Sequence, residues 1–463
     1  NTCGNYNTAV GRAALQSNIT GIQNTALGER SLCMATTGCR NTAVGYGSMQ
    51  NTSTGTRNTA IGENSLNQNS TAHDNVALGD HALYYNTTGQ YNTAAGRAAL
   101  QNNTTADYAT AFGGLALHNN TTGSYNTGIG FHAASSNTTG FGQTAVGYHA
   151  LICNTTGCRN TALGIFALCC NVTGCDNTAS GAYALYKNTG SNNSAFGFTA
   201  LISNTSGQYN TAVGACALYA NISGQRATAV GFMAAVSNTC GHHTTAIGNQ
   251  ALYSNTTGHS NTASGSYALY KNTTGACNQA YGTLSLYHNT TGCFNSGFGR
   301  ATLCSNTTGS KNTAVGSCAL GKLTTTCHNT AVGTDSLATS TTGCRNTAVG
   351  AGAGYAVTTG NRNTLIGQSA GPAITTGSQN TGSGYRVFNF MTTGCLNTAH
   401  GYHAGYCTTS GCYNVSMGFA ALRGTTTASN NTAIGTCALY NNTTAGSNTA
   451  VGAVAMQNNT TGE

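Results

Sequence analysis

The sequence predicts an all-β fold, a β-solenoid of 27 short coils. Three observations predict it. A 17-residue motif recurs 27 times along the 463 residues, and the fifth residue of every copy is glycine. Only 5% of the residues are Asp, Glu, Lys or Arg, against about 25% in ordinary globular proteins. Short units that cannot bury an apolar face alone indicate a stack in which each unit packs on its neighbours.

The repeat has the consensus N-T-A-V-G-x-x-A-L-x-x-N-T-T-G-x-x, and its positions are numbered 1 to 17 here. The first full copy begins at Asn7 and the last at Asn448. The copy at 177–192 has 16 residues, because its loop at 188–190 lacks one threonine. No linker interrupts the copies, so residues 1–463 are predicted to form one continuous array.

The residue type at each position predicts where its side chain points. Glycine at position 5 indicates a positive φ or a very close neighbour. Position 3 is Ala, Gly or Ser except at Leu365, and position 8 is almost always Ala or Ser. Position 4 is usually Val, Ile, Leu or Phe, and position 9 is usually Leu. We expect two large side chains, at positions 4 and 9, and two small ones to be buried, and positions 6 and 7 to point outward.

Two other chain classes agree less well with the sequence. Seventeen residues is half the length of one helix-hairpin repeat, but the glycines at positions 5 and 15 each cost about 1 kcal/mol in a helix relative to alanine. Disorder conflicts with a strict period and fixed apolar positions. Short strands separated by Gly and Asn turns remain. Stacked strands would place the Asn residues of positions 1 and 12 in ladders along the axis.

Two copies resemble a known family. The stretches N-T-A-V-G-Y-G-S-M from Asn41 and Q-T-A-V-G-Y-H-A-L from Gln143 are similar to YadA-type head repeats, which occur in trimeric autotransporter adhesins and related viral and phage fibre proteins. The resemblance implies a left-handed parallel β-roll, usually a homotrimer, with a role in surface attachment. The family's unit is shorter, so the N-T-T-G loop corresponds to an insertion, and the 463 residues show no coiled-coil stalk, membrane anchor or chaperone domain.

Position 12 begins an Asn-x-Ser/Thr sequon in 16 copies. In an exported eukaryotic or viral protein these are N-glycan acceptors; the alternative is a tight turn whose threonines pack in a column. The 16 acceptors are Asn18, Asn69, Asn86, Asn103, Asn120, Asn137, Asn154, Asn171, Asn204, Asn221, Asn255, Asn272, Asn289, Asn306, Asn442 and Asn459.

Residues 312–430 form a variant subsegment without these sequons. Position 12 there reads Leu323, Ser340, Val357, Ile374, Met391, Thr408 and Thr425, and position 9 becomes glycine at Gly354, Gly371 and Gly405. We expect Val357 and Ile374 to fill the space that two of these glycines leave. The segment is either a contact surface or the product of drift in a tolerant scaffold.

Cysteines are numerous, 20 in all, and several share a position in adjacent coils. Stacked positions about 4.8 Å apart lie within the Cα range of a disulfide. The predicted pairs are Cys158–Cys175, Cys153–Cys170, Cys327–Cys344 and Cys395–Cys412. The alternative is free thiols packed in columns as small apolar side chains.

The sequence contains few residues suited to catalysis, metal binding or nucleic-acid binding. Its eight carboxylates are scattered, so we expect no enzyme activity, no catalytic residues and no cofactor. Cys240, His242 and His243 lie close in sequence without zinc spacing, and we expect no metal site. Basic residues often precede position 1, without the clustering that nucleic acid needs; they are Arg40, Arg57, Arg159, Arg226, Lys311, Arg345 and Arg362. No apolar run is long enough to insert into a membrane.

The expected function is that of a non-enzymatic structural or adhesive extracellular fibre segment on a secreted, cell-surface or virion-surface fibre. Because no polar cap is visible, we expect a longer polypeptide or an end-to-end filament or trimer of this chain. A carbohydrate or a cell surface is a further expected partner, and tyrosines at position 10 such as Tyr253, Tyr270 and Tyr287 either grip sugars or pack on each other. Alternatives are an ice-binding solenoid with threonine columns at positions 2, 13 and 14, and a polysaccharide-binding spike.

Overall fold

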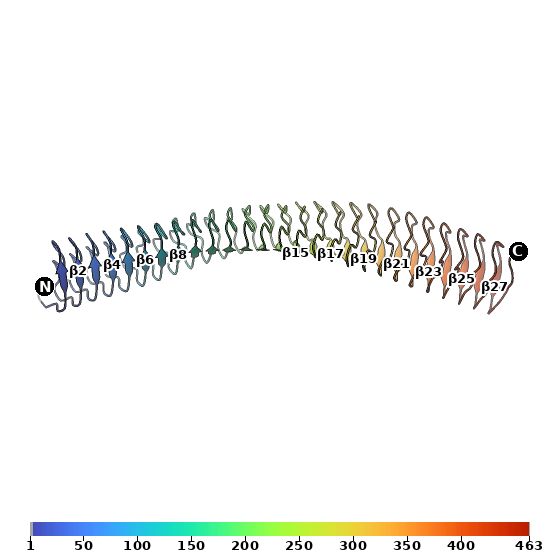
Figure 1. Cartoon of the computed structure of the whole chain (residues 1–463), viewed down its shortest axis with the longest axis horizontal. Helices are drawn as coiled ribbons and strands as arrows, with labels where there is room; N and C mark the ends of the chain where they lie inside the picture. Colours follow the sequence, from blue (N-terminus) through green and yellow to red (C-terminus); the bar gives the residue numbers. More distant parts are fainter. Residues whose placement is uncertain (1–2, 463) are drawn as a thin grey trace. The chain divides into compact units, whose positions relative to one another are not determined.

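The structure, a computed structural model, describes residues 3–462. It divides into two compact units, Asn1–Ala227 and Thr228–Glu463. In each unit the chain winds through successive coils, and every coil contributes one strand of three residues (Figure 1). The predicted all-β solenoid with a 17-residue repeat is confirmed.

The strands occupy positions 2 to 4 of each repeat. The first unit holds β1 (Thr8–Val10), β2 (Thr25–Leu27), β3 (Thr42–Val44), β4 (Thr59–Ile61), β5 (Val76–Leu78), β6 (Thr93–Ala95), β7 (Thr110–Phe112), β8 (Thr127–Ile129), β9 (Thr144–Val146), β10 (Thr161–Leu163), β11 (Thr178–Ser180), β12 (Ser194–Phe196) and β13 (Thr211–Val213). The second holds β14 (Thr228–Val230), β15 (Thr245–Ile247), β16 (Thr262–Ser264), β17 (Gln279–Tyr281), β18 (Ser296–Phe298), β19 (Thr313–Val315), β20 (Thr330–Val332), β21 (Thr347–Val349), β22 (Thr364–Ile366), β23 (Thr381–Ser383), β24 (Thr398–His400), β25 (Val415–Met417), β26 (Thr432–Ile434) and β27 (Thr449–Val451).

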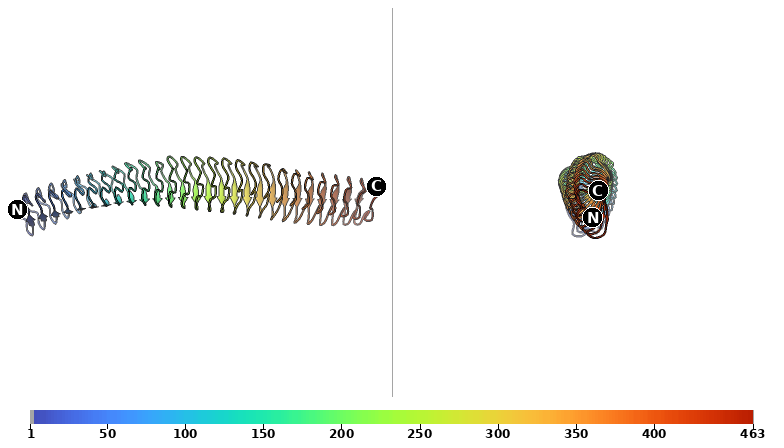
Figure 2. Two further views of the ribbon diagram at one scale, coloured as in Figure 1. Left: turned by 45° about the horizontal axis from the view of Figure 1, so that its top comes forward. Right: turned by 90° about the vertical axis from the view of Figure 1, so that its right-hand side faces the viewer.

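Within each unit, consecutive strands pair in parallel and in register. Thr8 of β1 lies opposite Thr25 of β2, and the same position faces itself in the later pairs. The short copy keeps this register, because Thr178 still pairs with Ser194. Figure 2 shows the strands along one side of each unit and the turns along the other.

The interior of a coil holds one large apolar side chain, not two. Leu83 at position 9 and the small residues Ala77 and Ala82 at positions 3 and 8 are fully buried. The expected burial of position 4 is wrong, since Phe112 is 45% exposed and Val10 is 56% exposed. Alternate residues of a strand point to opposite faces, so an inward position 3 directs positions 2 and 4 outward. The expected outward direction of positions 6 and 7 is confirmed for most coils.

Glycine at position 5 meets both expected conditions. Gly62 has a φ of 136°, and a Cβ there would lie 2.6 Å from the carbonyl carbon of Gly79 in the next coil. The sequence did not predict that positions 7, 9 and 17 also take positive φ, as His81, Leu83 and Tyr91 do. Sporadic glycines replace side chains at these same positions, where they relieve the backbone strain.

Two asparagine columns satisfy the backbone of the turns. At position 1, Asn41 Nδ2 donates to the Gly55 carbonyl at 2.8 Å, and Asn24 Oδ1 accepts the Asn41 backbone N–H at 2.9 Å. At position 12, Asn103 Nδ2 donates to Asn86 Oδ1 at 2.8 Å in the preceding coil. The predicted ladders are therefore confirmed, and they lie inside the coil.

In the variant subsegment 312–430, apolar residues replace the asparagine of the second ladder in four of the seven coils, and buried Ser340, Thr408 and Thr425 replace it in the other three. Leu323, Val357, Ile374 and Met391 at position 12 are fully buried. The space beside Gly354 is occupied by Leu337, Leu365 and Val357, and that beside Gly371 by Leu365 and Ile374. The expected refilling by Val357 and Ile374 is confirmed, and Leu365, the exceptional residue at position 3, contributes to both sites.

Candidate functional site

The most extensive candidate surface is a stripe of apolar side chains on the outer face of each sheet. We call it the sheet-face stripe; it consists of exposed position-4 residues, one on each of the strands that carry them. In the first unit these are Val10, Leu27, Ile61, Leu78, Phe112, Ile129, Leu163, Phe196 and Val213; in the second they are Val230, Ile247, Tyr281, Phe298, Val315, Val349, Ile366, Met417, Ile434 and Val451.

Aromatic side chains at position 6 widen the stripe. Phe131, Tyr148, Phe198 and Phe232 are all exposed next to it, and the rings of Phe131 and Tyr148 stack with centroids 5.9 Å apart. The stripe is interrupted where position 4 is Ala95, Ser180, Ser264, Ser383 or His400. Exposed apolar surfaces such as the runs between these residues usually mark sites of association.

The position-12 asparagines are not available as glycan acceptors. Fifteen of the 16 predicted acceptors are buried, and only Asn459 is partly exposed. In Asn86 the Nδ2 atom that would carry the sugar donates to the Gly89 carbonyl at 2.9 Å. A glycan would remove this atom from the interior and break the ladder. Burial of these side chains favours the turn over N-glycans at position 12, and glycosylation of these residues stays a prediction.

The 20 cysteines all carry free thiols. None of the four predicted disulfides is formed, but Cys158 and Cys175 bring their sulfur atoms to 2.8 Å. Burial, and then the Cys175 thiol, raise the pKa of Cys158 to about 11. Cys395 and Cys412 also stack, with the Cys395 backbone N–H donating to Cys412 Sγ at 3.3 Å. The Cys158–Cys175 bond remains a prediction with direct geometric support.

The Cys153–Cys170 pair lies beside a third thiol. Cys169 is the buried neighbour of both, and burial, together with Cys170 and Cys153, raises the pKa of Cys169 to about 12. Burial also raises the pKa of Cys153. These thiols are poor nucleophiles at neutral pH, because the thiolate is the reactive form.

Tyrosines at position 10 pack on each other. Of the two expectations for these residues, ring packing and sugar binding, this agrees with the first. The rings of Tyr253 and Tyr270 stack at 4.9 Å, and those of Tyr270 and Tyr287 stack at 5.2 Å. Burial raises the pKa of Tyr270. Face-to-face stacking along the axis covers the ring faces that a sugar would need, so this column supports packing.

Position 17 carries most of the paired charges. Arg57 donates two hydrogen bonds, of 2.7 and 2.8 Å, to the carboxylate of Asp74 in the next coil. Arg159 donates two, of 2.7 and 2.9 Å, to the carboxylate of Asp176. The hydrogen bonds from Arg57 and Arg159 lower the pKa of Asp74 and Asp176. Such solvent-exposed pairs add little to stability, but each neutralises its arginine.

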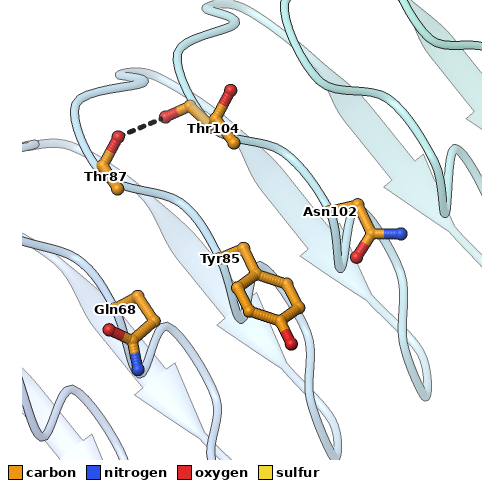
Figure 3. Close-up of a pocket in the computed structure, with 5 residues that line it drawn as sticks. All are labelled: Gln68, Tyr85, Thr87, Asn102 and Thr104. Carbon is orange, nitrogen blue, oxygen red and sulfur yellow. Dashed lines mark hydrogen bonds between the residues drawn. The ribbon is translucent and has the colours of Figure 1, made fainter.

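A shallow groove in the first unit surrounds a single exposed tyrosine. Its lining consists of Gln68, Tyr85 and Asn102 at position 11 with Thr87 and Thr104 at position 13. Figure 3 shows the ring of Tyr85 between the two amide side chains. Thr87 Oγ1 donates to the Thr104 carbonyl at 3.0 Å. An aromatic ring with uncharged amide and hydroxyl groups is suited to a neutral sugar.

Histidines of adjacent coils also meet in the first unit. His132 and His149 meet edge to face, with centroids 5.3 Å apart. Burial lowers the pKa of His132. Within residues 3–462, no three His, Cys, Asp or Glu side chains are arranged to hold a metal ion. This holds for Cys240, His242 and His243 as well.

No protein-family model matches the chain, and no curated protein matches it. Over the described residues, the structure has no helix with the length and apolar character needed to cross a membrane.

Proposed function

We propose that this chain is a non-enzymatic structural and adhesive fibre segment that acts outside the cell and associates side by side with further copies of itself. The observation that carries the proposal is the sheet-face stripe, which repeats an exposed apolar side chain along both units. Sheets that pack face to face through such side chains bury them from water. The trimer that the family resemblance implies is one arrangement that covers the stripe.

The scarcity of charge supports the same function. With 5% charged residues, little electrostatic repulsion opposes the approach of two stripes. The stacked coils supply a rigid, repetitive support rather than a cleft for substrate, as expected of repeat proteins that present extended surfaces.

Light scattering of the full chain at micromolar concentration tests the proposal. We expect a mass of two or more chains, and its reduction towards 46.7 kDa in the double variant Phe112→Lys, Phe298→Lys. The matched control, Thr122→Lys with Thr308→Lys, places the same charges at exposed position-14 sites and should leave the assembly intact. A monomeric native chain, or equal disruption by both variants, would refute side-by-side association through the stripe.

A second candidate, carbohydrate binding, is favoured by the groove at Tyr85. Titration with a neutral glucose hexasaccharide should show binding that Tyr85→Ala abolishes. Tyr125→Ala, which removes an exposed ring from a stacked column, is the control and should have no effect. Binding that survives Tyr85→Ala would exclude this groove.

The ice-binding alternative has less support. The hydroxyl groups of position-13 threonines such as Thr87 donate hydrogen bonds to a backbone carbonyl of the next coil. On the sheet face, the exposed rings of Phe112 and Tyr281 interrupt a flat surface. An ice-binding protein needs a regular exposed plane, so we expect no thermal hysteresis.

A further inference from the structure

A column of basic side chains runs across four consecutive coils of the second unit. Lys311, His328, Arg345 and Arg362 all occupy position 17, and all are exposed. We call these four residues the basic column. Each takes a positive φ between 57° and 64°, so their backbones share one conformation.

Backbone hydrogen bonds hold the basic column in register. The Arg345 N–H donates to the Cys327 carbonyl at 3.4 Å, and the Arg362 N–H donates to the Cys344 carbonyl at 3.0 Å. Each residue of position 17 is thereby tied to position 16 of the preceding coil. Side chains on neighbouring coils of a parallel sheet start about 4.8 Å apart, so Lys311, Arg345, Arg362 and the imidazole of His328 form a single row.

The basic column has no counter-charge, unlike the arginines of the first unit. Among residues 3–462, no ion pair involves Lys311, His328, Arg345 or Arg362. The only carboxylate in residues 295–379 is Asp335 at position 7, where it lines a separate hollow with Lys322 and Tyr355. By contrast, Asp74 and Asp176 neutralise Arg57 and Arg159 at the equivalent position.

Such a row favours an extended anion over a single one. Two like charges about 5 Å apart in water repel by about 1 kcal/mol, and an anion placed along the row relieves several of these repulsions at once. A hollow of about 310 Å³ adjoins the end of the column and is lined by Cys344, Asn361, Arg362, Ser378 and Gln379.

The hollow offers hydrogen bonds as well as charge. Asn361 accepts the Cys344 N–H through Oδ1 at 2.8 Å, which leaves its Nδ2 to donate outward. Hydroxyl, amide and guanidinium groups side by side suit sugar hydroxyls and sulfate or carboxylate groups.

We propose that the basic column binds a linear anionic polysaccharide that carries sulfate or carboxylate groups along its length. A linear chain of anionic groups laid along the row can contact Lys311, Arg345 and Arg362 together, while the imidazole of His328 between them offers a further hydrogen bond. Single-stranded nucleic acid fits less well, because its non-specific binding relies on aromatic side chains that stack on bases, and the column contains none. The proposal is independent of self-association, which uses position 4.

Heparin is the probe for the experiment, with the full-length chain immobilised and binding measured at low and at physiological salt. We expect the double variant Arg345→Gln, Arg362→Gln to weaken heparin binding by about tenfold or more. The matched control, Arg57→Gln with Arg159→Gln, removes two arginines at the same position that are already neutralised, and should change the affinity by less than about twofold. Binding should weaken with added salt.

Two further probes separate the alternatives. Uncharged dextran should not bind, and single-stranded poly(dT) should bind more weakly than heparin. Equal losses in both double variants, equal binding of dextran, or tighter binding of poly(dT) would each overturn the proposal. Circular dichroism of every variant verifies that the solenoid is intact, and the assembly state measured by light scattering should be the same in all of them.

Discussion

Asn120 is a single buried side chain that connects three coils. Its Nδ2 donates to Asn103 Oδ1 at 3.0 Å and to the Gly123 carbonyl at 2.9 Å, and its Oδ1 accepts Asn137 Nδ2 at 2.8 Å. Each polar group left unpaired in the interior costs about 1 to 3 kcal/mol. The neighbouring Asn119 is half-buried and accepts one hydrogen bond, from Asn102, at 2.8 Å.

Replacement of these neighbours gives a direct comparison. We expect Asn120→Ala to lower the free energy of unfolding by about 3 kcal/mol, and Asn119→Ala to lower it by about 1 kcal/mol or less. Urea titrations followed by circular dichroism measure both. Similar losses would show that the position-12 ladder does not stabilise the interior more than a surface amide does.

The thiol of Cys158 gives a pH-dependent prediction. Its pKa is raised from 9.0 to about 11, so the protonated thiol stabilises the fold below pH 9, and this stability is lost as the pH rises through about 11. The thiolate is also the species that forms a disulfide. With diamide as the oxidant, which takes up the two electrons and two protons, Cys158–Cys175 bond formation should accelerate from pH 9 to about pH 11.

Peptide mapping under non-reducing conditions follows this reaction. Cys327 and Cys344 share a position in adjacent coils, and they provide the control because the structure brings no sulfur atoms together there. They should cross-link more slowly than Cys158 and Cys175. A rate that is already maximal at pH 9 would contradict the raised pKa.

At the scale of the coil, the residue types predicted the repeat length and the strands, but not which side chains of every strand point into the coil. Invariant glycine and recurrent leucine predicted the turn at Gly62 and the burial of Leu83, because few other residues satisfy those sites. Position 4 was misassigned, since Ala77 and Leu78 alternate in any strand and only the small space inside the coil decides which points inward. The burial of Asn86 could not be predicted from the sequence either, because Asn-Thr-Thr turns are usually exposed on the surface.

Two glycines of one coil test the reason for the invariant position. A Cβ on Gly350 would lie 2.6 Å from the carbonyl carbon of Gly367, whereas a Cβ on Gly352 has no heavy atom nearer than 3.8 Å. We therefore expect Gly350→Ala to destabilise the chain by about 3 kcal/mol, and Gly352→Ala by about 1 kcal/mol. Thermal unfolding measures both, and equal effects would mean that backbone conformation alone requires glycine at position 5.

The packing of the variant subsegment can be tested through Leu365. Its side chain fills the space beside Gly354 and Gly371, so Leu365→Ala should leave a cavity and cost about 3 kcal/mol. Ile366 follows it directly but is 44% exposed, and Ile366→Ala should cost about 1 kcal/mol or less. If the two substitutions have the same effect in urea titrations, Leu365 does not compensate for the two glycines.

On the scale of the whole molecule, both units repeat one coil and bury the same columns. The glycan acceptors were a reasonable expectation from the Asn-x-Ser/Thr pattern, but they lie where the coil has no room for sugar. When the protein is secreted from a eukaryotic cell, we expect the buried position-12 asparagines to stay unmodified. Accessible acceptors include the partly exposed Asn459 and four exposed sequon residues at other positions, Asn192, Asn430, Asn441 and Asn458.

Mass spectrometry before and after glycosidase treatment measures the occupancy. Peptide mapping assigns each glycan to its asparagine, and we expect none on the 15 buried position-12 residues. Glycans on these residues in the native, folded protein would show that the position-12 turns open outward.

The position-1 ladder also sets an order of events during synthesis. Asn24 Oδ1 accepts the backbone N–H of Asn41, so each finished coil presents an acceptor to the coil that the ribosome makes next. Partners in these ladders are about 17 residues apart, and contacts this local close early and cheaply in folding. The nascent chain can therefore build its own template, and each emerging coil is added in the direction of translation without waiting for the rest of the polypeptide.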